Sequence, residues 1–309
     1  MATLPRVLVV AGPTASGKSA LALLLAQELR GVIINADSIQ CYRDLPTLTA
    51  RPTLTDEARA PHRLYGFLEP SAMLSATAWA AQAAAQIRDV SEAGQTPIVV
   101  GGTGFYLKAL MDGLSDIPAV PAEVRDAAQA LLAEKGASAV HALLAERDPV
   151  SAARIKPTDT QRITRAWEVL EATATPLSTW QAQPTVPALN ATYMCVLVQP
   201  ARDDLYAACD RRFEQMLEAG ALAEVRELGL PTTSPVMRAL GAVELADHLA
   251  GKTDLATAKT LAQAATRHYA KRQTTWFRHQ FRKDFMIETK FSESLFREIF
   301  PEIRRLLLT

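Results

Sequence analysis

The sequence has few cysteines, no long apolar run and no excess of charge of either sign. Its three cysteines, Cys41, Cys195 and Cys209, are widely spaced and form no Cys-x-x-Cys pair, which disfavours a disulfide framework and a structural zinc site. No apolar run approaches the roughly 18 residues of a membrane-spanning helix. The first residues also lack the long apolar stretch of a secretory signal. We therefore expect a cytoplasmic protein that does not contact the membrane.

The balance of charge disfavours one further class of protein. Lys and Arg total 33 and Asp and Glu total 33, whereas nucleic-acid-binding proteins usually carry a basic excess. A total of zero can still conceal a local basic cluster. With 49% hydrophobic residues the chain is also too apolar to be mainly disordered, and its 309 residues predict about two domains.

The clearest motif is a glycine-rich segment between a predicted strand and a predicted helix. Residues 6–11 form a short β-branched run, and residues 20–29 are strong helix formers. Between them, the segment GPTASGKS matches the pattern G-x-x-x-x-G-K-[ST] of a phosphate-binding loop, or P-loop. The motif consists of Gly12, Pro13, Thr14, Ala15, Ser16, Gly17, Lys18 and Ser19.

The chemistry of this motif is that of a diphosphate or triphosphate site. Gly12 and Gly17 let the backbone curl so that its N–H groups point at phosphate oxygens, and the following helix adds its positive dipole end. Lys18 supplies a mobile positive charge, and the Ser19 hydroxyl can hold Mg²⁺. The motif does not specify a reaction.

Two polar residues follow other predicted strands. Asp37 comes just after the strand predicted for residues 32–35, and Thr103 lies in a second glycine turn after the strand predicted for residues 96–100. Ligands of open α/β sheets bind at the carboxyl ends of the strands. Asp37 is therefore a candidate general base or Mg²⁺ ligand, or only the first residue of an Asx turn. The second glycine turn either faces a phosphate or holds no ligand.

The pattern changes in the middle of the chain. Helical stretches with little strand signal run from about residue 112 to residue 190, and a buried strand returns at residues 193–198. We predict a discontinuous α/β core of residues 1–112 and 191–309, with an inserted α-helical domain of residues 113–190. Arg202, Arg211 and Arg212 follow the returning strand. They are candidates for a phosphate clamp, or are surface charges paired with nearby acids.

Two segments carry a local excess of basic residues. Between residues 154 and 165 four basic residues face one acid, with Arg162 and Arg165 on one predicted helix face. Residues 267–283 carry six Lys or Arg, no acid and several aromatic residues. Guanidinium groups beside aromatic rings suit the binding of unpaired bases and phosphates. The alternative is that Trp276 and Phe277 belong to the core.

Together these motifs resemble those of the bacterial tRNA dimethylallyltransferases. The resemblance spans almost the whole chain and rests on residues 12–19, 37–42, 101–106, 161–165 and 270–278. It implies a P-loop NTPase-like parallel sheet flanked by helices, with the helical domain inserted. It also implies transfer of a dimethylallyl group from dimethylallyl diphosphate to N6 of the adenine 3′-adjacent to the anticodon in tRNA. The chain departs from the family pattern at Ala242 and Val243, where an aromatic and a basic residue are usual.

The resemblance assigns roles to residues already noted. Lys18, Asp37 and Thr103 are the implied catalytic residues, with Asp37 deprotonating the adenine. The P-loop and Arg212 would hold the diphosphate, and Ser19 would share Mg²⁺ with it. A monomer would bind the anticodon stem-loop. The implied tRNA contacts are Asp37, Ser38, Ile39, Gln40, Thr103, Arg125, Gln161, Arg162, Ile163, Thr164, Arg165, Lys271, Arg272 and Arg278.

Three other functions share parts of this pattern. A small-molecule kinase would use the P-loop but leaves the basic aromatic segment unexplained. A prenyltransferase acting on free AMP or ADP would have little use for an inserted domain with an arginine face. A P-loop protein that only binds RNA would not need Asp37 beside the P-loop.

Overall fold

The computed structural model describes residues 4–308 and divides the chain into two compact units. Unit 1 comprises residues 1–111 and 187–309, and unit 2 comprises residues 112–186. The division predicted from the sequence has the same order, with boundaries at residues 112/113 and 190/191. Residues 1–3 and 309, at the ends of the predicted core, lie outside the described part of the chain.

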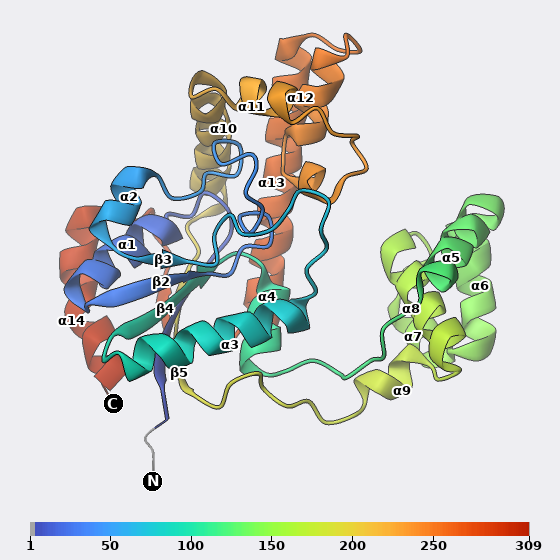
Figure 1. The fold of residues 1–309 in the computed structure, drawn as a ribbon, viewed down its shortest axis with the longest axis horizontal. Helices are drawn as coiled ribbons and strands as arrows, with labels where there is room; N and C mark the ends of the chain where they lie inside the picture. Colours follow the sequence, from blue (N-terminus) through green and yellow to red (C-terminus); the bar gives the residue numbers. More distant parts are fainter. Residues whose placement is uncertain (1–3, 309) are drawn as a thin grey trace. The chain divides into compact units, whose positions relative to one another are not determined.

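Unit 1 is built on a parallel sheet. Within residues 4–308 six strands pair in the order β3-β2-β4-β1-β5-β6, and every pairing is parallel (Figure 1). This confirms the predicted α/β fold with a P-loop NTPase-like sheet. The strands are β1 (Arg6–Ala11), β2 (Gly31–Asn35), β3 (His62–Arg63), β4 (Thr96–Gly101), β5 (Thr192–Val198) and β6 (Phe285–Ile287).

The central strands are apolar because both faces of the sheet are covered. All of β1 after Arg6 is buried, between β4 and β5. Leu8 and Val10 pack with helix α1 (Lys18–Glu28) and helix α14 (Glu293–Leu308) in one core cluster. Helices α3 (Ala76–Glu92) and α4 (Gly104–Met111) pack on each other, and α3 also packs on β2 and β4.

The later helices of unit 1 form a layer beside the sheet. Helix α13 is long and runs beside α10 (Figure 1). It mixes buried alanines with charged residues, and no helix in residues 4–308 is long and apolar enough to cross a membrane. The remaining elements of unit 1 are α2 (Leu54–Arg59), α10 (Arg202–Glu218), α11 (Ala221–Leu228), the 3₁₀ helix η1 (Pro235–Arg238), α12 (Ala242–Leu249) and α13 (Leu255–Gln280).

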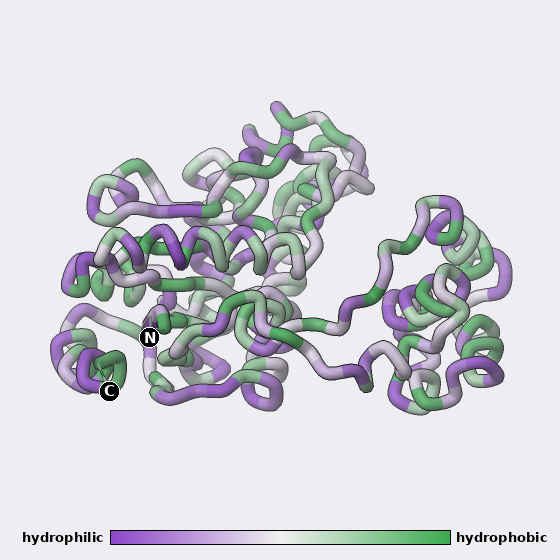
Figure 2. The backbone as a smooth tube through the Cα atoms, turned by 60° about the horizontal axis from the view of Figure 1, so that its bottom comes forward, coloured by the Kyte–Doolittle hydropathy of each residue, from purple (hydrophilic) through white to green (hydrophobic). Residues whose placement is uncertain are grey.

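Unit 2 is entirely helical in its regular elements. Its helices alternate between hydrophilic and hydrophobic stretches, as amphipathic helices do (Figure 2). Leu144, Ala166 and Val169 are fully buried in its core cluster. The helices are α5 (Ala122–Lys135), α6 (Ala137–Arg147), α7 (Pro149–Arg154), α8 (Thr160–Thr173) and α9 (Leu177–Gln181).

Candidate functional site

The candidate site lies at the carboxyl edge of the sheet. Because all the strands are parallel, the loops that follow them meet at this edge. The loop of residues 12–19 follows β1, Asp37 follows β2, and Thr103 follows β4 in the turn of residues 101–104. Gln273 of α13 also reaches the 12–19 loop, from a helix far away in the sequence.

The 12–19 loop has the backbone of a phosphate-binding loop. Gly17 has a φ of +93°, and Ala15 also has a positive φ of 61°. A Cβ added at Gly12 would lie 2.4 Å from the carbonyl oxygen of Val198, so only glycine fits there without a shift. The buried hydroxyl of Ser16 has no hydrogen-bond partner among the described residues. The loop thus offers a polar atom that an anion or its metal ion could satisfy.

Lys18 is held inside this loop. Its Nζ donates a hydrogen bond to the carbonyl oxygen of Pro13 at 3.2 Å, and the residue is 8% exposed. Burial lowers the pKa of Lys18 to about 8, with the Arg212 charge also lowering it and the Asp37 charge opposing the fall. A buried ammonium group of this kind gains most from an arriving anion.

Four basic residues line a cavity of about 400 Å³ beside the loop. They are Lys18, Arg211, Arg212 and Lys290, and Ser19 lies with them. Arg212 donates hydrogen bonds to the Thr14 hydroxyl at 3.2 Å and to the carbonyl oxygen of Thr49 at 3.4 Å. No acidic residue lines this cavity. We refer to it as the cation cavity.

Asp37 forms an Asx turn and still leaves a carboxylate oxygen available. Its Oδ1 accepts a hydrogen bond from the Ile39 N–H at 3.1 Å, and its own N–H donates to Asn35 Oδ1 at 2.8 Å. Oδ2 has no hydrogen-bond donor among residues 4–308. The turn therefore orients the carboxylate and leaves Oδ2 free to accept a proton or a hydrogen bond.

Thr103 links the two loops that follow β2 and β4. Its hydroxyl accepts from the Ser38 N–H at 3.0 Å, and its own N–H donates to the carbonyl oxygen of Ala36 at 3.2 Å. Tyr269 of α13 lies beside Thr103 and Asp37; burial raises its pKa, and the Asp37 charge adds to the rise. Thr103 is thus placed between Asp37 and helix α13.

Gln273 joins α13 to both glycine-rich loops. Its Oε1 accepts from the Thr14 N–H at 2.8 Å, and its Nε2 donates to the carbonyl oxygen of Gly102 at 2.8 Å. The side chain is 6% exposed. The motif at residues 270–278 includes Gln273, but its role in joining the two loops could not be predicted from the sequence, because its partners are 259 and 171 residues away.

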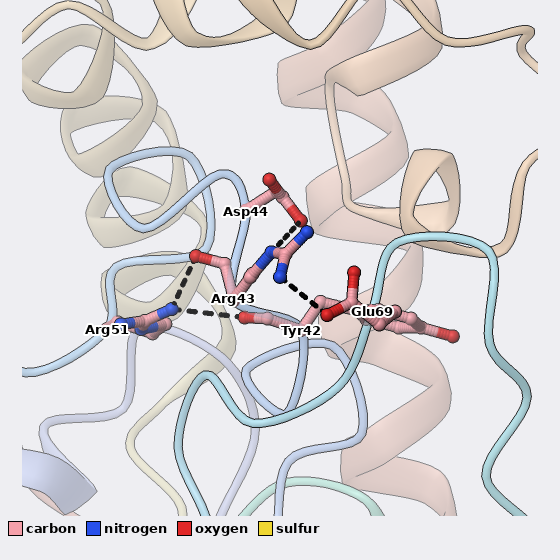
Figure 3. A network of polar contacts seen from close by, with 5 residues as sticks. All are labelled: Tyr42, Arg43, Asp44, Arg51 and Glu69. Atoms are coloured by element: carbon pink, nitrogen blue, oxygen red, sulfur yellow. Dashed lines mark hydrogen bonds and ion pairs between the residues drawn. The ribbon is translucent and has the colours of Figure 1, made fainter.

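The loop after Asp37 is held by side chains from its own far end. Arg51 donates to the carbonyl oxygens of Tyr42 at 3.1 Å and Arg43 at 2.8 Å, and Arg43 pairs with Glu69 at 2.5 Å (Figure 3). Gln40 donates to the carbonyl oxygens of Thr49 and Ala50. Gln40 is therefore already bonded within its own loop.

In unit 2 the predicted RNA contacts fall into two groups. Arg125, Gln161, Arg162 and Arg165 are exposed. By contrast, Ile163 is fully buried and Thr164 is 5% exposed, and the Thr164 hydroxyl bonds to the Thr160 carbonyl. Their side chains pack into unit 2. The prediction that the Ile163 and Thr164 side chains contact RNA directly is therefore wrong for this structure.

The arginine charges of α8 are also partly compensated. Arg162 pairs with Asp159 at 3.5 Å, and Arg165 pairs with Glu168 at 3.4 Å. Each pair joins an exposed arginine to a carboxylate three residues away, Asp159 at the N-cap of α8 or Glu168 within the helix. Ion pairs of exposed side chains contribute little to stability. The cations remain accessible to a stronger anionic ligand.

Helix α13 presents its basic residues outward. Lys271, Arg272 and Arg278 are exposed, whereas Phe277 is fully buried. The alternative that these aromatic residues belong to the core is therefore correct for Phe277. Trp276 is half-buried against Gly104. Ala242, at the departure from the family pattern, is fully buried.

The three arginines that follow β5 do not act together. Arg211 and Arg212 line the cation cavity, while Arg202 lines a different cavity. The alternative was that nearby acids form ion pairs with these arginines. Two of those acids instead pair with other residues: Asp210 with Arg267 and Glu214 with Lys259. The cation cavity therefore keeps its charge.

This arrangement favours nucleophilic displacement at a carbon bearing a diphosphate. The cation cavity can stabilise a departing diphosphate, and the oriented Asp37 carboxylate can accept a proton. Lys290 and Gln273 are site residues that the sequence did not indicate, and Arg211 was only one of three alternatives for a phosphate clamp. Lys290 gave no signal beyond its charge, whereas Arg211 was noted but not assigned.

Known proteins match almost the whole chain. The family model described as IPP transferase matches residues 40–280. A tRNA dimethylallyltransferase of Paramagnetospirillum magneticum is 51% identical over 304 residues, covering 97% of this chain and 96% of that protein. One of Rhodospirillum centenum is 55% identical over 278 residues, covering 89% of this chain and 88% of that protein.

Solved structures give the same answer for the fold. A tRNA isopentenylpyrophosphate transferase of Bacillus halodurans is 31% identical with a TM-score of 0.68, covering 98% of this chain and 97% of that one. A eukaryotic dimethylallyltransferase acting on tRNA is 26% identical with a TM-score of 0.79, covering 95% of this chain and 77% of that one. From its sequence matches and its fold, the chain belongs to the IPP transferase family.

Proposed function

We propose that the protein transfers a dimethylallyl group from dimethylallyl diphosphate to N6 of the adenine 3′-adjacent to the anticodon in tRNA, releasing diphosphate. The observation that carries the proposal is an oriented carboxylate, Asp37, near a cavity lined by four basic residues and no acid. The names of the relatives at about half identity over most of the chain support the same reaction.

The donor binds through its diphosphate. Lys18 and Arg212 contact the phosphate oxygens, and the backbone N–H groups of the 12–19 loop add neutral donors. The orphan Ser16 hydroxyl and the exposed Ser19 fit a hard cation that accompanies the diphosphate. Ser19 is the residue that would hold Mg²⁺, which when bound neutralises charge on the diphosphate. Arg211 and Lys290 stabilise the leaving group further.

The acceptor is a poor nucleophile, because the lone pair of the adenine amine is delocalised into the ring. A bond forms between N6 and the first carbon of the dimethylallyl group as the bond from that carbon to the diphosphate oxygen breaks. Asp37 accepts the N6 proton through its carboxylate, and Thr103 holds the loop that carries Asp37 against the loop after β4. Positioning of this kind can contribute about 7–11 kcal/mol.

The tRNA substrate is bound by phosphate contacts and by a base taken out of its stack, which costs a few kcal/mol. In unit 2, Arg125, Gln161, Arg162 and Arg165 are the exposed side chains proposed to contact it. In unit 1, α13 contributes Lys271, Arg272 and Arg278. Cytoplasmic location and a monomeric state stay predictions from the sequence.

The test of the reaction uses dimethylallyl diphosphate with a labelled dimethylallyl group, offered in parallel with unmodified tRNA and with AMP. We expect label in tRNA alone. Label in AMP alone would favour a prenyltransferase of free nucleotides. Absence of label together with phosphoryl transfer from ATP would favour a kinase.

The Asp37→Asn variant tests the base. The amide oxygen can still accept the Ile39 N–H, so the turn is kept while the proton acceptor is removed. We expect transfer to fall about 10²–10⁴-fold while tRNA affinity is retained. Normal turnover at saturating tRNA would contradict the assignment of Asp37 as the base.

A further inference from the structure

A second cavity lies at the same edge of the sheet, after β5 and β6. Its volume is about 500 Å³, within the range of ligand sites, and it shares no lining residue with the cation cavity. Its walls come from Gln199 after β5, the start of α10, one face of α13, and Glu288 after β6. We refer to it as the α10–α13 cavity.

The α10–α13 cavity is basic. Arg202, Lys271 and Arg278 line it, against the single carboxylate of Glu288. Within residues 4–308 no ion pair neutralises these three cations. The N-terminus of α10 also lines this cavity and has no side-chain cap. Asp203 and Asp204 in its first turn do not line the cavity, but they offset part of the positive charge of the free N–H groups.

Polar groups in the wall lack partners. Two residues of the wall, Gln199 and Thr274, each have a buried side-chain oxygen (Oε1 and Oγ1) with no hydrogen-bond partner among the described residues. In the same wall the Arg202 guanidinium lies over the ring of Tyr206, 5.1 Å from its centroid. A guanidinium group beside an aromatic ring offers a surface on which a nucleobase can stack.

Helix α13 uses different faces for the two cavities. Lys271, Thr274, Thr275 and Arg278 recur at the spacing of one helix face and line the α10–α13 cavity. Gln273 and Trp276 lie on other parts of the helix surface and contact the 101–104 loop. The two cations of the α10–α13 cavity therefore do not reach toward that loop with Gln273.

We propose that the α10–α13 cavity binds one nucleotide of the tRNA strand other than the reacting adenine. Its phosphate lies among Arg202, Lys271 and Arg278, and its base stacks on Arg202 and Tyr206. Three cations, unsatisfied hydrogen-bonding groups and a surface for stacking suit a nucleotide better than an apolar peptide. This inference rests on the proposed tRNA substrate. It places Lys271 and Arg278, already proposed to contact tRNA, in one site with Arg202 and Tyr206, which no tRNA-binding motif in the sequence includes.

Arg202→Ala tests the binding of the phosphate in the full chain. The dissociation constant of an unmodified anticodon stem-loop is measured across a series of salt concentrations. We expect weaker binding and a salt slope smaller by about 0.7, the value for one phosphate of a single strand. Arg297→Ala, which removes an exposed cation from α14, is the matched control and should leave the slope unchanged.

Glu288→Gln should change stem-loop affinity in the opposite direction to Arg202→Ala. Removing the one carboxylate from the cavity should tighten stem-loop binding, and Tyr206→Leu should weaken it without changing the salt slope. Unchanged stem-loop affinity in Arg202→Ala and Glu288→Gln would overturn the inference. So would altered affinity for inorganic diphosphate in place of RNA. Failure of the wild-type protein to modify tRNA would instead refute the proposed function, so the two failures are distinguishable.

Discussion

At the scale of single residues, Gln273 has the most to lose by substitution. In Gln273→Met the Thr14 N–H and the Gly102 carbonyl lose their partner, which costs about 1–3 kcal/mol for each group left buried and unpaired. Because both loops then shift, we expect kcat to fall and KM for dimethylallyl diphosphate to rise. Urea unfolding and steady-state kinetics measure the two effects.

Gln263→Met is the matched control for Gln273. Gln263 lies on the same helix and donates to the carbonyl oxygen of Asp210, outside the two loops. This variant should lose stability with little change in KM for the donor. Equal kinetic effects in both variants would reduce Gln273 to a purely structural residue.

Lys18 gives the donor site a pH dependence. Burial lowers its pKa to about 8, so the ammonium is charged below that pH and becomes neutral as pH rises through it. Affinity for inorganic diphosphate should therefore decline above about pH 8. Calorimetric titration across pH measures this. In Lys18→Met this decline should be lost, since the group that loses its positive charge near pH 8 is absent. An identical pH profile would exclude Lys18.

The predictability of a residue depended on where its partners lie. Lys18, Ser19 and Asp37 stand beside short motifs whose chemistry is local, and the structure brings them to one sheet edge. Gln273 and Lys290 act across long chain separations, which no local pattern records. Arg202 shows the converse: its neighbours in sequence suggested a role with Arg212, but the start of α10 places it in another cavity.

At the scale of elements, Asp148 joins two helices of unit 2. It caps α7 by accepting from the Ser151 N–H at 3.0 Å, and it accepts from the Ser178 hydroxyl of α9 at 2.6 Å. Burial opposes its ionisation, but these hydrogen bonds outweigh burial and hold the pKa of Asp148 below its usual value. The stabilisation is therefore present above about pH 4 and is lost as pH falls below it.

Asp148→Ala should lower the free energy of unfolding of unit 2 by about 1–3 kcal/mol. Asp148→Asn should lose less, because its amide oxygen can still cap α7. Trp167 and Trp180 lie in unit 2, so their fluorescence during urea unfolding reports the change. Asp126→Asn on α5 controls for loss of charge. No difference between Asp148→Ala and Asp126→Asn would contradict the capping role.

Elements with a strong period or a complete motif were predicted well. β1 and β5 fall within a residue of the predicted strands, and α5 to α9 all lie within the region predicted to be helical. The short strands β3 and β6 were not predicted, because two or three residues are too few to show an alternation of apolar and polar side chains. They pair with the free edges of β2 and β5. The segment at residues 267–283 was understood by its charge, but not as the end of a helix beginning at Leu255.

For the whole molecule, the net charge of zero conceals an uneven distribution. Arg162→Ala with Arg165→Ala should weaken tRNA binding and lower its salt slope by about 0.7–0.9 for each phosphate that is no longer neutralised. Binding titrations at several salt concentrations measure this. Lys135→Ala with Arg147→Ala removes the same charge from the ends of α5 and α6. An equal effect of both double variants would indicate general attraction in place of a defined binding site.

The three cysteines make the two units distinguishable in solution. All are buried in unit 1, where burial raises the pKa of Cys41 to about 12 and that of Cys209 to about 11. Thiolates react with alkylating reagents and thiols do not, so the folded unit 1 should be labelled very slowly at neutral pH. Unit 2 contains no cysteine. Alkylation of the three cysteines therefore reports on the opening of unit 1 alone and is insensitive to the unfolding of unit 2. Comparing the labelling rates with and without diphosphate would measure how much bound diphosphate stabilises unit 1 against opening.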